Sequence, residues 1–299
     1  MRVLVSGLVN IETTLRVDGF PIEYRPVLYP FGGVSSSVSG VGVNVAAALK
    51  RLGDEVAFLS LVGADAAGDL ALEGLSRLGV PTDGVLRDLD ATAQSVILYD
   101  GDGRRQINVD LKDIQERRYP AGRFRAAAAG ADAFVLCNIN FNRELLPLAR
   151  ESGKPVFTDV HTLSDPADDY NEDFMAAAEV LFVSDERLWA PPAEAARELM
   201  DRYGCRIVVV GLGAKGALLL ETGSPALAVS AVRARKVIST IGAGDALFSA
   251  FAHFLLAGRR APEALELATR FASWKIGETG AAAGFLTEKE TLELKVGQL

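Results

Sequence analysis

Short apolar runs alternate with amphipathic helical patterns along most of the chain, and this alternation is the feature that most constrains the fold. The strand-like runs are residues 3–5, 56–62, 134–136, 156–158, 180–183 and 207–210. The helical patterns are residues 45–52, 69–78, 123–129, 143–151, 192–203, 246–257 and 262–278. Repeated strand–helix units predict an α/β fold in which a mostly parallel sheet is covered by helices on both faces.

Two segments break this alternation. Residues 13–29 alternate apolar and charged side chains, and residues 92–110 have the pattern of a hairpin with its turn at 100–103. Half-buried β segments inside an α/β chain predict a small sheet separate from the main one, which we expect to act as a lid. We therefore expect a single domain over residues 1–299 with a two-segment lid.

Composition excludes several classes of function. The net charge of −8 argues against a non-specific nucleic-acid binder, and no apolar run reaches membrane-spanning length. Cys137 and Cys205 form no CxxC pair, which is typical of buried thiols in a reducing cytoplasm. With only two histidines, His161 and His253, a His-rich zinc site is not expected, and His161 is expected to have a structural role.

The stretch 239–248 carries the strongest functional signal. The turn Gly242-Ala243-Gly244 leads directly into an apolar helical pattern, so free backbone amides and the positive end of a helix dipole point at one spot. A phosphoryl group would fit there, and Asp245 would take the proton of a hydroxyl nucleophile. The plainer alternative is a Gly-rich loop in which Asp245 is an ordinary N-cap.

Four further motifs accompany this stretch. Asn10 and Glu12 lie at the carboxyl end of the first expected strand, where open α/β sheets bind ligands. A Gly-rich loop containing Gly42 and Asn44 opens the next helix. The runs 62–68 (VGADAAG) and 210–216 (VGLGAKG) follow in order.

In the order and spacing of these motifs, the chain resembles the ribokinase-like (PfkB) family of carbohydrate and nucleoside kinases over almost its whole length. The resemblance rests on the N-terminal signature (Gly40, Gly42, Asn44 and Ala46), the VGxDxxG run at 62–68 and the GAGD run at 242–245. It implies an α/β/α sandwich with a β lid and ATP- and Mg²⁺-dependent phosphorylation of a hydroxyl. Asp245 would be the base, and the amides of Gly242, Ala243 and Gly244 would stabilise the transferring charge.

The resemblance also implies roles for other residues. Asn10, Glu12, Gly42, Asn44 and, more weakly, Asn138 resemble the residues that bind the acceptor. Gly213, Gly216, Ser184 and Ser273 resemble those near the nucleotide. Asp159 matches a family Asp or is a strand-end turn residue. No residue is assigned to a metal.

The chain departs from the family pattern at five positions. Glu12 stands where Asp is usual, Ser184 and Arg187 stand at the NxxE positions, and Gly211 replaces a Thr. Ser239 replaces an Asp that binds a monovalent cation, so K⁺ activation is not expected. Asp185 or Glu186 are the alternatives for the missing NxxE residues.

Other functions are weighed against this one. The run 211–216 also fits GxGxxG, but neither the required helix nor the required acid follows, so a dinucleotide-binding dehydrogenase is rejected; no P-loop motif occurs. The acceptor is a sugar or a nucleoside, and the sequence does not choose between them. An inactive sugar- or nucleotide-binding protein of the same fold is the alternative of a different class. A homodimer through the apolar lids is expected.

Overall fold

A nine-stranded sheet forms the centre of the computed structural model, which describes residues 1–102, 104–295 and 297–298. The strands lie in the order β13-β12-β11-β10-β9-β8-β1-β4-β5. The pairs from β11 to β5 are parallel, whereas β12 and β13 are antiparallel additions at one edge. The bounds are β1 (Arg2–Ser6), β4 (Glu55–Gly63), β5 (Gly84–Leu89), β8 (Ala133–Leu136), β9 (Val156–Thr162), β10 (Val180–Ser184), β11 (Ile207–Gly211), β12 (Ala217–Glu221) and β13 (Leu227–Val229). The predicted mostly parallel sheet is confirmed.

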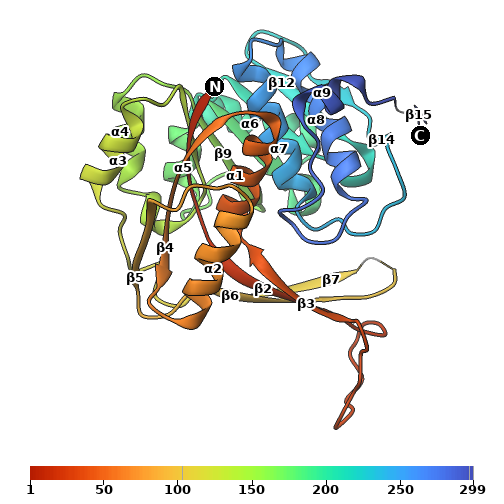
Figure 1. Ribbon diagram of the computed structural model, residues 1–299. Helices are drawn as coiled ribbons and strands as arrows, with labels where there is room; N and C mark the ends of the chain where they lie inside the picture. Colours follow the sequence, from red (N-terminus) through yellow and green to blue (C-terminus); the bar gives the residue numbers. More distant parts are fainter. Residues whose placement is uncertain (103, 296, 299) are drawn as a thin grey trace.

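Helices cover both faces of this sheet (Figure 1), so the predicted three-layer α/β/α sandwich is confirmed as well. One face carries α1 (Val41–Leu52), α2 (Ala66–Arg77), α7 (Ala243–Leu256) and α8 (Ala261–Lys275). The other carries α3 (Ala121–Ala128), α4 (Leu145–Glu151), α5 (Glu172–Ala177) and α6 (Pro192–Tyr203). Helix α9 (Glu288–Glu293) packs on α8.

The two cores follow from the alternation of side chains along the strands. In β1, Val3 and Val5 belong to the core under α1 and α7, whereas Leu4 belongs to the core under α3 and α4. On the first face, Phe182 of β10 makes edge-to-face contacts with two rings of α7, Phe248 at 5.0 Å and Phe251 at 5.4 Å between centroids. Burial of each ring contributes about 1.5–3 kcal/mol, so these contacts fix the position of α7.

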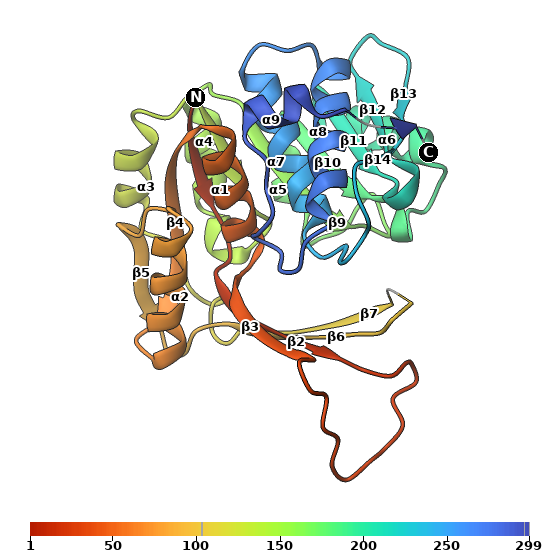
Figure 2. The ribbon, with the colours of Figure 1, turned by 45° about the vertical axis from the view of Figure 1, so that its right-hand side comes forward.

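A second sheet lies apart from the first, as Figure 2 shows. Its strands are β2 (Asn10–Arg16), β3 (Val34–Ser39), β6 (Gln94–Tyr99) and β7 (Arg105–Asp110), in the order β3-β2-β6-β7. The predicted separate lid sheet therefore exists. Its first segment differs from the prediction, because β2 ends at Arg16 and residues 17–33 contain no strand. They form an extended arm, and the chain returns as β3, which the sequence pattern did not indicate.

Short elements complete the described structure: β14 (Val232–Arg233) pairs with β15 (Gly297–Gln298), and single helical turns lie at Asn140–Asn142, Asp185–Arg187 and Gly213–Lys215. Among the described residues, no helix has both the length and the apolar character needed to cross a membrane.

Candidate active site

One buried cluster contains side chains from three elements: the first turn of α7, the first turn of α1 and the start of the lid strand β2. Asp245 of α7 accepts a 2.6 Å hydrogen bond at Oδ2 from Nδ2 of Asn44 in α1. The charge of Asp245 raises the pKa of Glu12, and both carboxylates raise the pKa of Lys275. The structure thus brings together residues that the sequence assigned separately to the chemistry and to the acceptor.

Asp245 is held in a low-dielectric position at a helix start. Asp245 is only 9% exposed, and burial raises the pKa of its carboxyl above the ordinary value. His161, the Asn44 hydrogen bond and Lys275 act in the opposite direction on this pKa, whereas Asp159 raises it. The carboxyl group is therefore a stronger base than an exposed aspartate.

The turn before Asp245 presents backbone amides. Gly242 is the N-cap of α7 with φ 76°, a left-handed conformation that favours glycine. The amide of Ala243 donates to the Thr240 carbonyl at 3.2 Å. In the described part of the chain, the amides of Gly242 and Gly244 have no acceptor within hydrogen-bonding distance. Two of the three amides predicted to hold a phosphoryl group are thus free, and the third is engaged.

Three acceptor atoms on β2 and α1 are buried without a hydrogen-bond donor among the described residues: Asn10 Oδ1, Glu12 Oε1 and Asn44 Oδ1. The other polar atom of each side chain is fixed, because Asn10 Nδ2 donates to Ser95 Oγ at 2.9 Å and Glu12 Oε2 accepts from Ser39 Oγ at 3.0 Å. Burial raises the pKa of Glu12. Since buried polar atoms are normally paired, these three indicate a site for hydroxyl donors.

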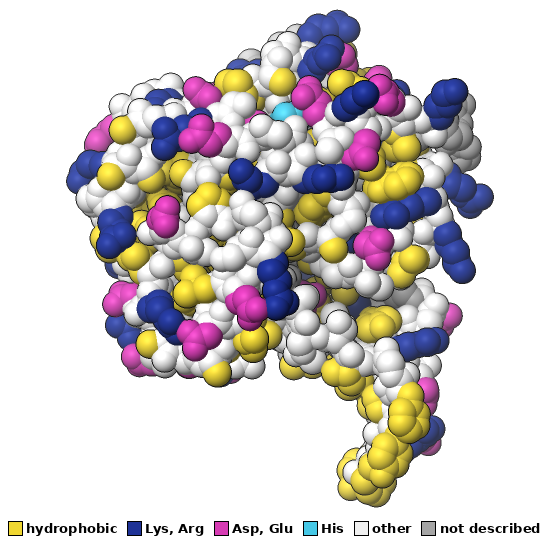
Figure 3. Space-filling model, viewed as in Figure 1, with side chains coloured by type: hydrophobic (Ala, Val, Ile, Leu, Met, Phe, Trp, Pro, Cys, Tyr) yellow, Lys and Arg dark blue, Asp and Glu magenta, His cyan; other side chains and the backbone are white. Residues whose placement is uncertain are grey.

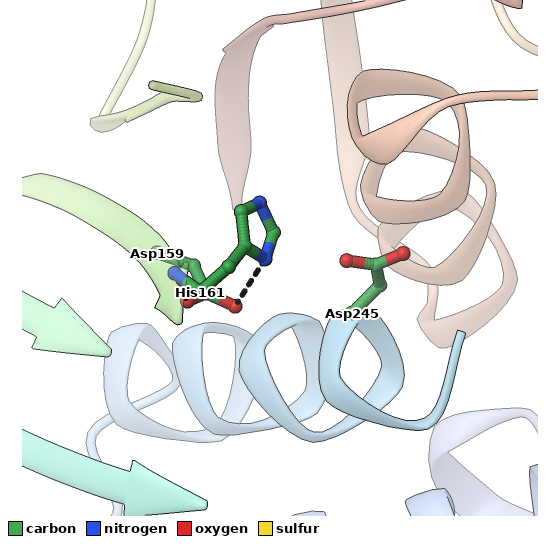
Figure 4. Close-up of side chains that lie close together, drawn as sticks. All are labelled: Asp159, His161 and Asp245. Carbon is green, nitrogen blue, oxygen red and sulfur yellow. Dashed lines mark hydrogen bonds and ion pairs between the residues drawn. The ribbon is translucent and has the colours of Figure 1, made fainter. Parts of the chain in front are cut away.

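His161 also lies in the cluster, although the sequence analysis gave it only a structural role. It has φ 59°, which is unusual for a residue other than glycine, and its backbone N–H donates to Asp159 Oδ1 at 2.8 Å. Its ring Nδ1 lies 3.6 Å from Asp159 Oδ2 (Figure 4), and the ring points between Asp159 and Asp245. A left-handed residue at the end of a strand has no signature in side-chain periodicity, so sequence reasoning could not place it.

Ligand atoms of Asp159, His161 and Asp245 all lie within 4.8 Å of one another. Magnesium prefers oxygen ligands and its own waters, and an imidazole is an unfavourable partner for it. This cluster is therefore a poor fit to a dedicated Mg²⁺ site.

The residues predicted near the nucleotide lie at the ends of β10 and β11 and on α8. Ser184 ends β10 and its Oγ accepts from the Glu186 amide at 3.3 Å, and Ser273 is buried in α8. Gly213 has φ 56° and open space around it, whereas a Cβ on Gly216 would lie 2.0 Å from the Val229 carbonyl. Gly216 is therefore required for packing against β13, and contact of these four residues with a nucleotide stays a prediction.

Two predicted acceptor residues have evident packing roles. A Cβ on Gly42 would lie 2.6 Å from the backbone carbon of Gly7, so this glycine lets α1 approach β1. Asn138 donates to Asn171 Oδ1 at 3.0 Å and borders a cleft of about 320 Å³. The cleft is otherwise mostly apolar and reaches the lid; it is lined by Leu8, Val41, Val109, Leu111, Gln115, Cys137, Ile139 and Tyr170.

Two cationic residues at the site were not predicted. Arg105 of lid strand β7 donates to Thr240 Oγ1 at 2.8 Å, which connects the lid to the turn before α7. Its guanidinium also lies 3.9 Å from Glu186, one of the proposed NxxE substitutes. Lys275 at the end of α8 donates to the Ile241 carbonyl. Neither stands out in sequence, because single charges on strands and helices usually face solvent.

The structure combines an α/β/α sandwich, a separate lid sheet that carries Asn10 and Glu12, and a buried carboxylate at a helix start, an arrangement typical of kinases of sugars and nucleosides. The family model described as pfkB family carbohydrate kinase matches residues 1–288. The chain therefore belongs to the PfkB family, and the resemblance read from its motifs is confirmed.

Curated relatives agree with this assignment. The chain is 31% identical over 312 residues to a protein of Halopiger xanaduensis named ATP-dependent ribose-1-phosphate kinase, covering 97% of this chain and 99% of that one. It is 28% identical to the bifunctional protein HldE of Mesorhizobium japonicum, over 86% of this chain. It spans only 54% of that longer relative.

Solved structures share the fold at low identity. The acarbose kinase Mak1 superposes with a TM-score of 0.88 at 24% identity, with 98% of each chain covered. Arabidopsis thaliana ribokinase, solved with ribose and ATP, gives a TM-score of 0.82 at 22% identity, with 98% of this chain and 97% of that one covered. At these identities the likeness establishes the fold alone.

Proposed function

We propose that the chain transfers the γ-phosphoryl group of ATP to a hydroxyl of a small sugar or sugar-like acceptor, with Asp245 as the base. One observation carries the proposal: Asn44 and Glu12 each have a buried acceptor atom without a donor among the described residues, Asn44 bonds to the buried Asp245 carboxylate, and the Asp245 charge acts on Glu12. Asn10, with a third such atom, precedes Glu12 by two residues on β2. A polyhydroxylated acceptor donates hydrogen bonds to all three and presents one hydroxyl to Asp245. The relative named for ribose 1-phosphate supports a furanose.

Each residue then has a defined task. Asn44 orients the Asp245 carboxylate through its amide, and burial makes that carboxylate basic enough to accept the hydroxyl proton. The free amides of Gly242 and Gly244 stabilise negative charge on the transferring group, with Ala243 holding the turn. ATP supplies the phosphoryl group, and Gly213, Gly216, Ser184 and Ser273 are proposed to border it.

Magnesium is proposed as the cofactor that neutralises the phosphates. The oxygen ligand that the chain would offer this ion is the carboxylate of Glu186 in the turn after β10, since hard cations take oxygen ligands. Asp185 is the alternative to Glu186 in the same helical turn.

A nucleoside acceptor is the second candidate, and the apolar cleft beside Asn138 favours it. Leu8, Val41 and Tyr170 offer surfaces on which a base could pack. The amides of Gln115 and Asn138 are already bonded, to Tyr170 Oη at 3.1 Å and to Asn171 at 3.0 Å. They are therefore less available to read the edge of a base than their position suggests.

The test is an ADP-release assay with Mg-ATP and a panel of pentoses, hexoses, ribose 1-phosphate and nucleosides, preceded by a thermal-shift screen of the same compounds. A sugar that both raises Tm and is phosphorylated supports the proposal, and preference for a nucleoside supports the second candidate. Ligands that raise Tm without any ADP release indicate an inactive binding protein and contradict both.

A homodimer through the lids is proposed on the apolar side chains that the arm exposes. Tyr24, Tyr29 and Phe31 of the arm are 88%, 74% and 95% exposed, and the arm forms the projection rich in hydrophobic side chains at the lower right of Figure 3. A second copy of the chain would bury them. Sedimentation should show a dimer that dissociates in Tyr24→Ser/Phe31→Ser, and a wild-type monomer at micromolar concentration would contradict this.

A cytoplasmic location is proposed because the enzyme would need ATP. Both cysteines, Cys137 and Cys205, are buried free thiols, which suits a reducing compartment. Fractionation of cells that express the chain tests this.

A further inference from the structure

A lysine ammonium is buried beneath the turn that begins α7. Lys275 is the last residue of α8 and has no exposed surface. Its Nζ donates to the carbonyl of Ile241, the residue before N-cap Gly242. Burial of a lysine is unfavourable unless the charge is paired and hydrogen-bonded, so this arrangement is retained against a cost.

The segment that leads to α7 lies against the end of α8. The amides of Ile238 and Ser239 donate to the Ile276 carbonyl at 2.8 and 3.0 Å, and Arg235 Nε donates to the Trp274 carbonyl at 2.6 Å. The hydrogen bond from Lys275 to the Ile241 carbonyl adds a contact at the residue directly before Gly242. The Ile241 carbonyl lies beside the start of α7, where the positive end of the helix dipole disfavours a cation, so the ammonium depends on this hydrogen bond and on the charges of nearby carboxylates.

Four charged groups act on Lys275. Burial is the largest effect and lowers the pKa of Lys275 to about 8. This pKa is raised by three carboxylates, those of Asp245 in α7, Glu12 in β2 and Glu278, and it is lowered by Arg235. In return, Lys275 lowers the pKa values of Asp245 and Glu12. The ammonium is therefore coupled to both carboxylates on which the proposed function depends.

We propose that Lys275 is a positioning residue whose ammonium acts as an attached monovalent cation, fixing the turn that holds the transferring phosphoryl group and balancing the charge of the Asp245 carboxylate. This inference rests on the proposed function. An ammonium on the Ile241 carbonyl polarises the Ile241–Gly242 peptide, so the Gly242 amide becomes a stronger donor. The same carbonyl is then unavailable to a free K⁺ ion, in agreement with Ser239 in place of an acidic residue.

The first experiment measures the coupling without any turnover. Lysine side chains labelled with ¹³C are titrated by NMR, and Lys275→Met identifies the signal of Lys275. We expect a midpoint near 8 in the wild type and a lower midpoint in Asp245→Asn, because a charge that raises this pKa is removed. A midpoint at the ordinary lysine value of 10.5 that does not change in Asp245→Asn would overturn the proposal.

The second experiment is chemical rescue. Lys275→Ala should lower kcat about 10- to 100-fold, as expected for loss of a charged hydrogen bond, with a smaller change in the acceptor KM. Ammonium or methylammonium should restore part of kcat, whereas tetramethylammonium at equal ionic strength, which has no N–H, should not. Lys289→Ala, at an exposed lysine of α9, is the matched control and should leave kcat unchanged.

The outcomes separate this inference from the proposed function. Two outcomes overturn the role of Lys275 while the kinase activity stands. In the first, Lys275→Ala keeps the wild-type kcat. In the second, Lys275→Ala keeps the wild-type Tm but has a lowered kcat that no small amine restores. A wild type that phosphorylates no acceptor overturns the proposed function, and the NMR titration then still decides whether Lys275 and Asp245 are coupled. If Lys275→Ala fails to fold, the titration of the wild type and Asp245→Asn decides alone.

Discussion

Replacement of Asp245 by Asn separates the chemistry proposed for this carboxylate from its structural contacts. The introduced amide has nearly the shape of the carboxyl group, and its oxygen can still accept the hydrogen bond from Asn44 Nδ2. What the variant loses is the ability to take a proton. Asp245→Asn should therefore lower kcat by about 10²- to 10⁴-fold, the usual contribution of a general base, with acceptor and ATP binding largely kept.

Stability should change in the opposite direction. Burial raises the pKa of Asp245 above 3.8, so the stability associated with this group is complete below pH 3.8 and is lost as pH rises through the higher folded-state pKa. Above that folded-state pKa the ionised carboxylate is thus destabilised by its burial, and a neutral replacement removes this penalty. Tm of Asp245→Asn should be equal to or above that of the wild type at pH 7.5, and the difference should shrink as pH falls.

The assay pairs steady-state ADP release, at saturating ATP and acceptor, with thermal unfolding of the same preparations across pH 4–8. Thermal-shift titration of the acceptor checks that binding is kept. Turnover in Asp245→Asn comparable to the wild type would refute the role of base. A large loss of kcat accompanied by a fall in Tm would instead show that the variant is damaged, and the reasoning on burial would fail.

Three other perturbations follow from the site and the fold. Glu12→Ala should raise the acceptor KM about 10- to 100-fold and leave the ATP KM nearly unchanged. The control Glu116→Ala, at an exposed residue, should alter neither KM. Equal effects of Glu12→Ala on both KM values would contradict the acceptor role. Gly216→Ala should lower Tm more than Gly213→Ala, because only the former brings a Cβ within 2.0 Å of the Val229 carbonyl; the reverse order in thermal unfolding would contradict this. Replacement of K⁺ by tetramethylammonium should leave kcat little changed, and strong K⁺ activation would show that an external ion is bound.

Most of the main sheet and its helices were predictable, because central strands buried on both faces leave a clear apolar pattern. The edge strand β5, which has exposed residues, and the short helix α5 were not predicted. The strand β3 was not predictable, since its residues Val34 and Ser35–Ser37 are exposed and carry no alternation. The reverse error arose in the arm, where Val17, Phe20 and Ile22 alternate with polar residues but form no strand. Helix α8 ends at Lys275, three residues before the expected 278, because its end bonds to the segment before α7.

At the site, sequence motifs found the groups that lie at element ends and missed those placed by tertiary contacts. Asp245, Asn44 and Glu12 were identified, and the structure brings them together. His161 depends on a left-handed backbone, Lys275 on the packing of α8 against α7, and Arg105 on the position of the lid. Contacts of this kind join residues far apart in the chain, so no local pattern reports them. The motifs do not identify the acceptor, because its pocket is also formed by residues far apart in the chain.

The parallel pairing of β2 with β6 has a consequence for the order in which the site is assembled. Ile11 lies opposite Gln94, so the lid sheet cannot form until residues at the end of β6, up to Tyr99, have emerged from the ribosome. Closing so long a loop is slow, because its entropic cost precedes any gain from pairing. Asp245 is synthesised far later still. Strands β2 and β6 can thus pair before Asp245 is synthesised, so the proposed acceptor side of the site is available for assembly earlier than the proposed base.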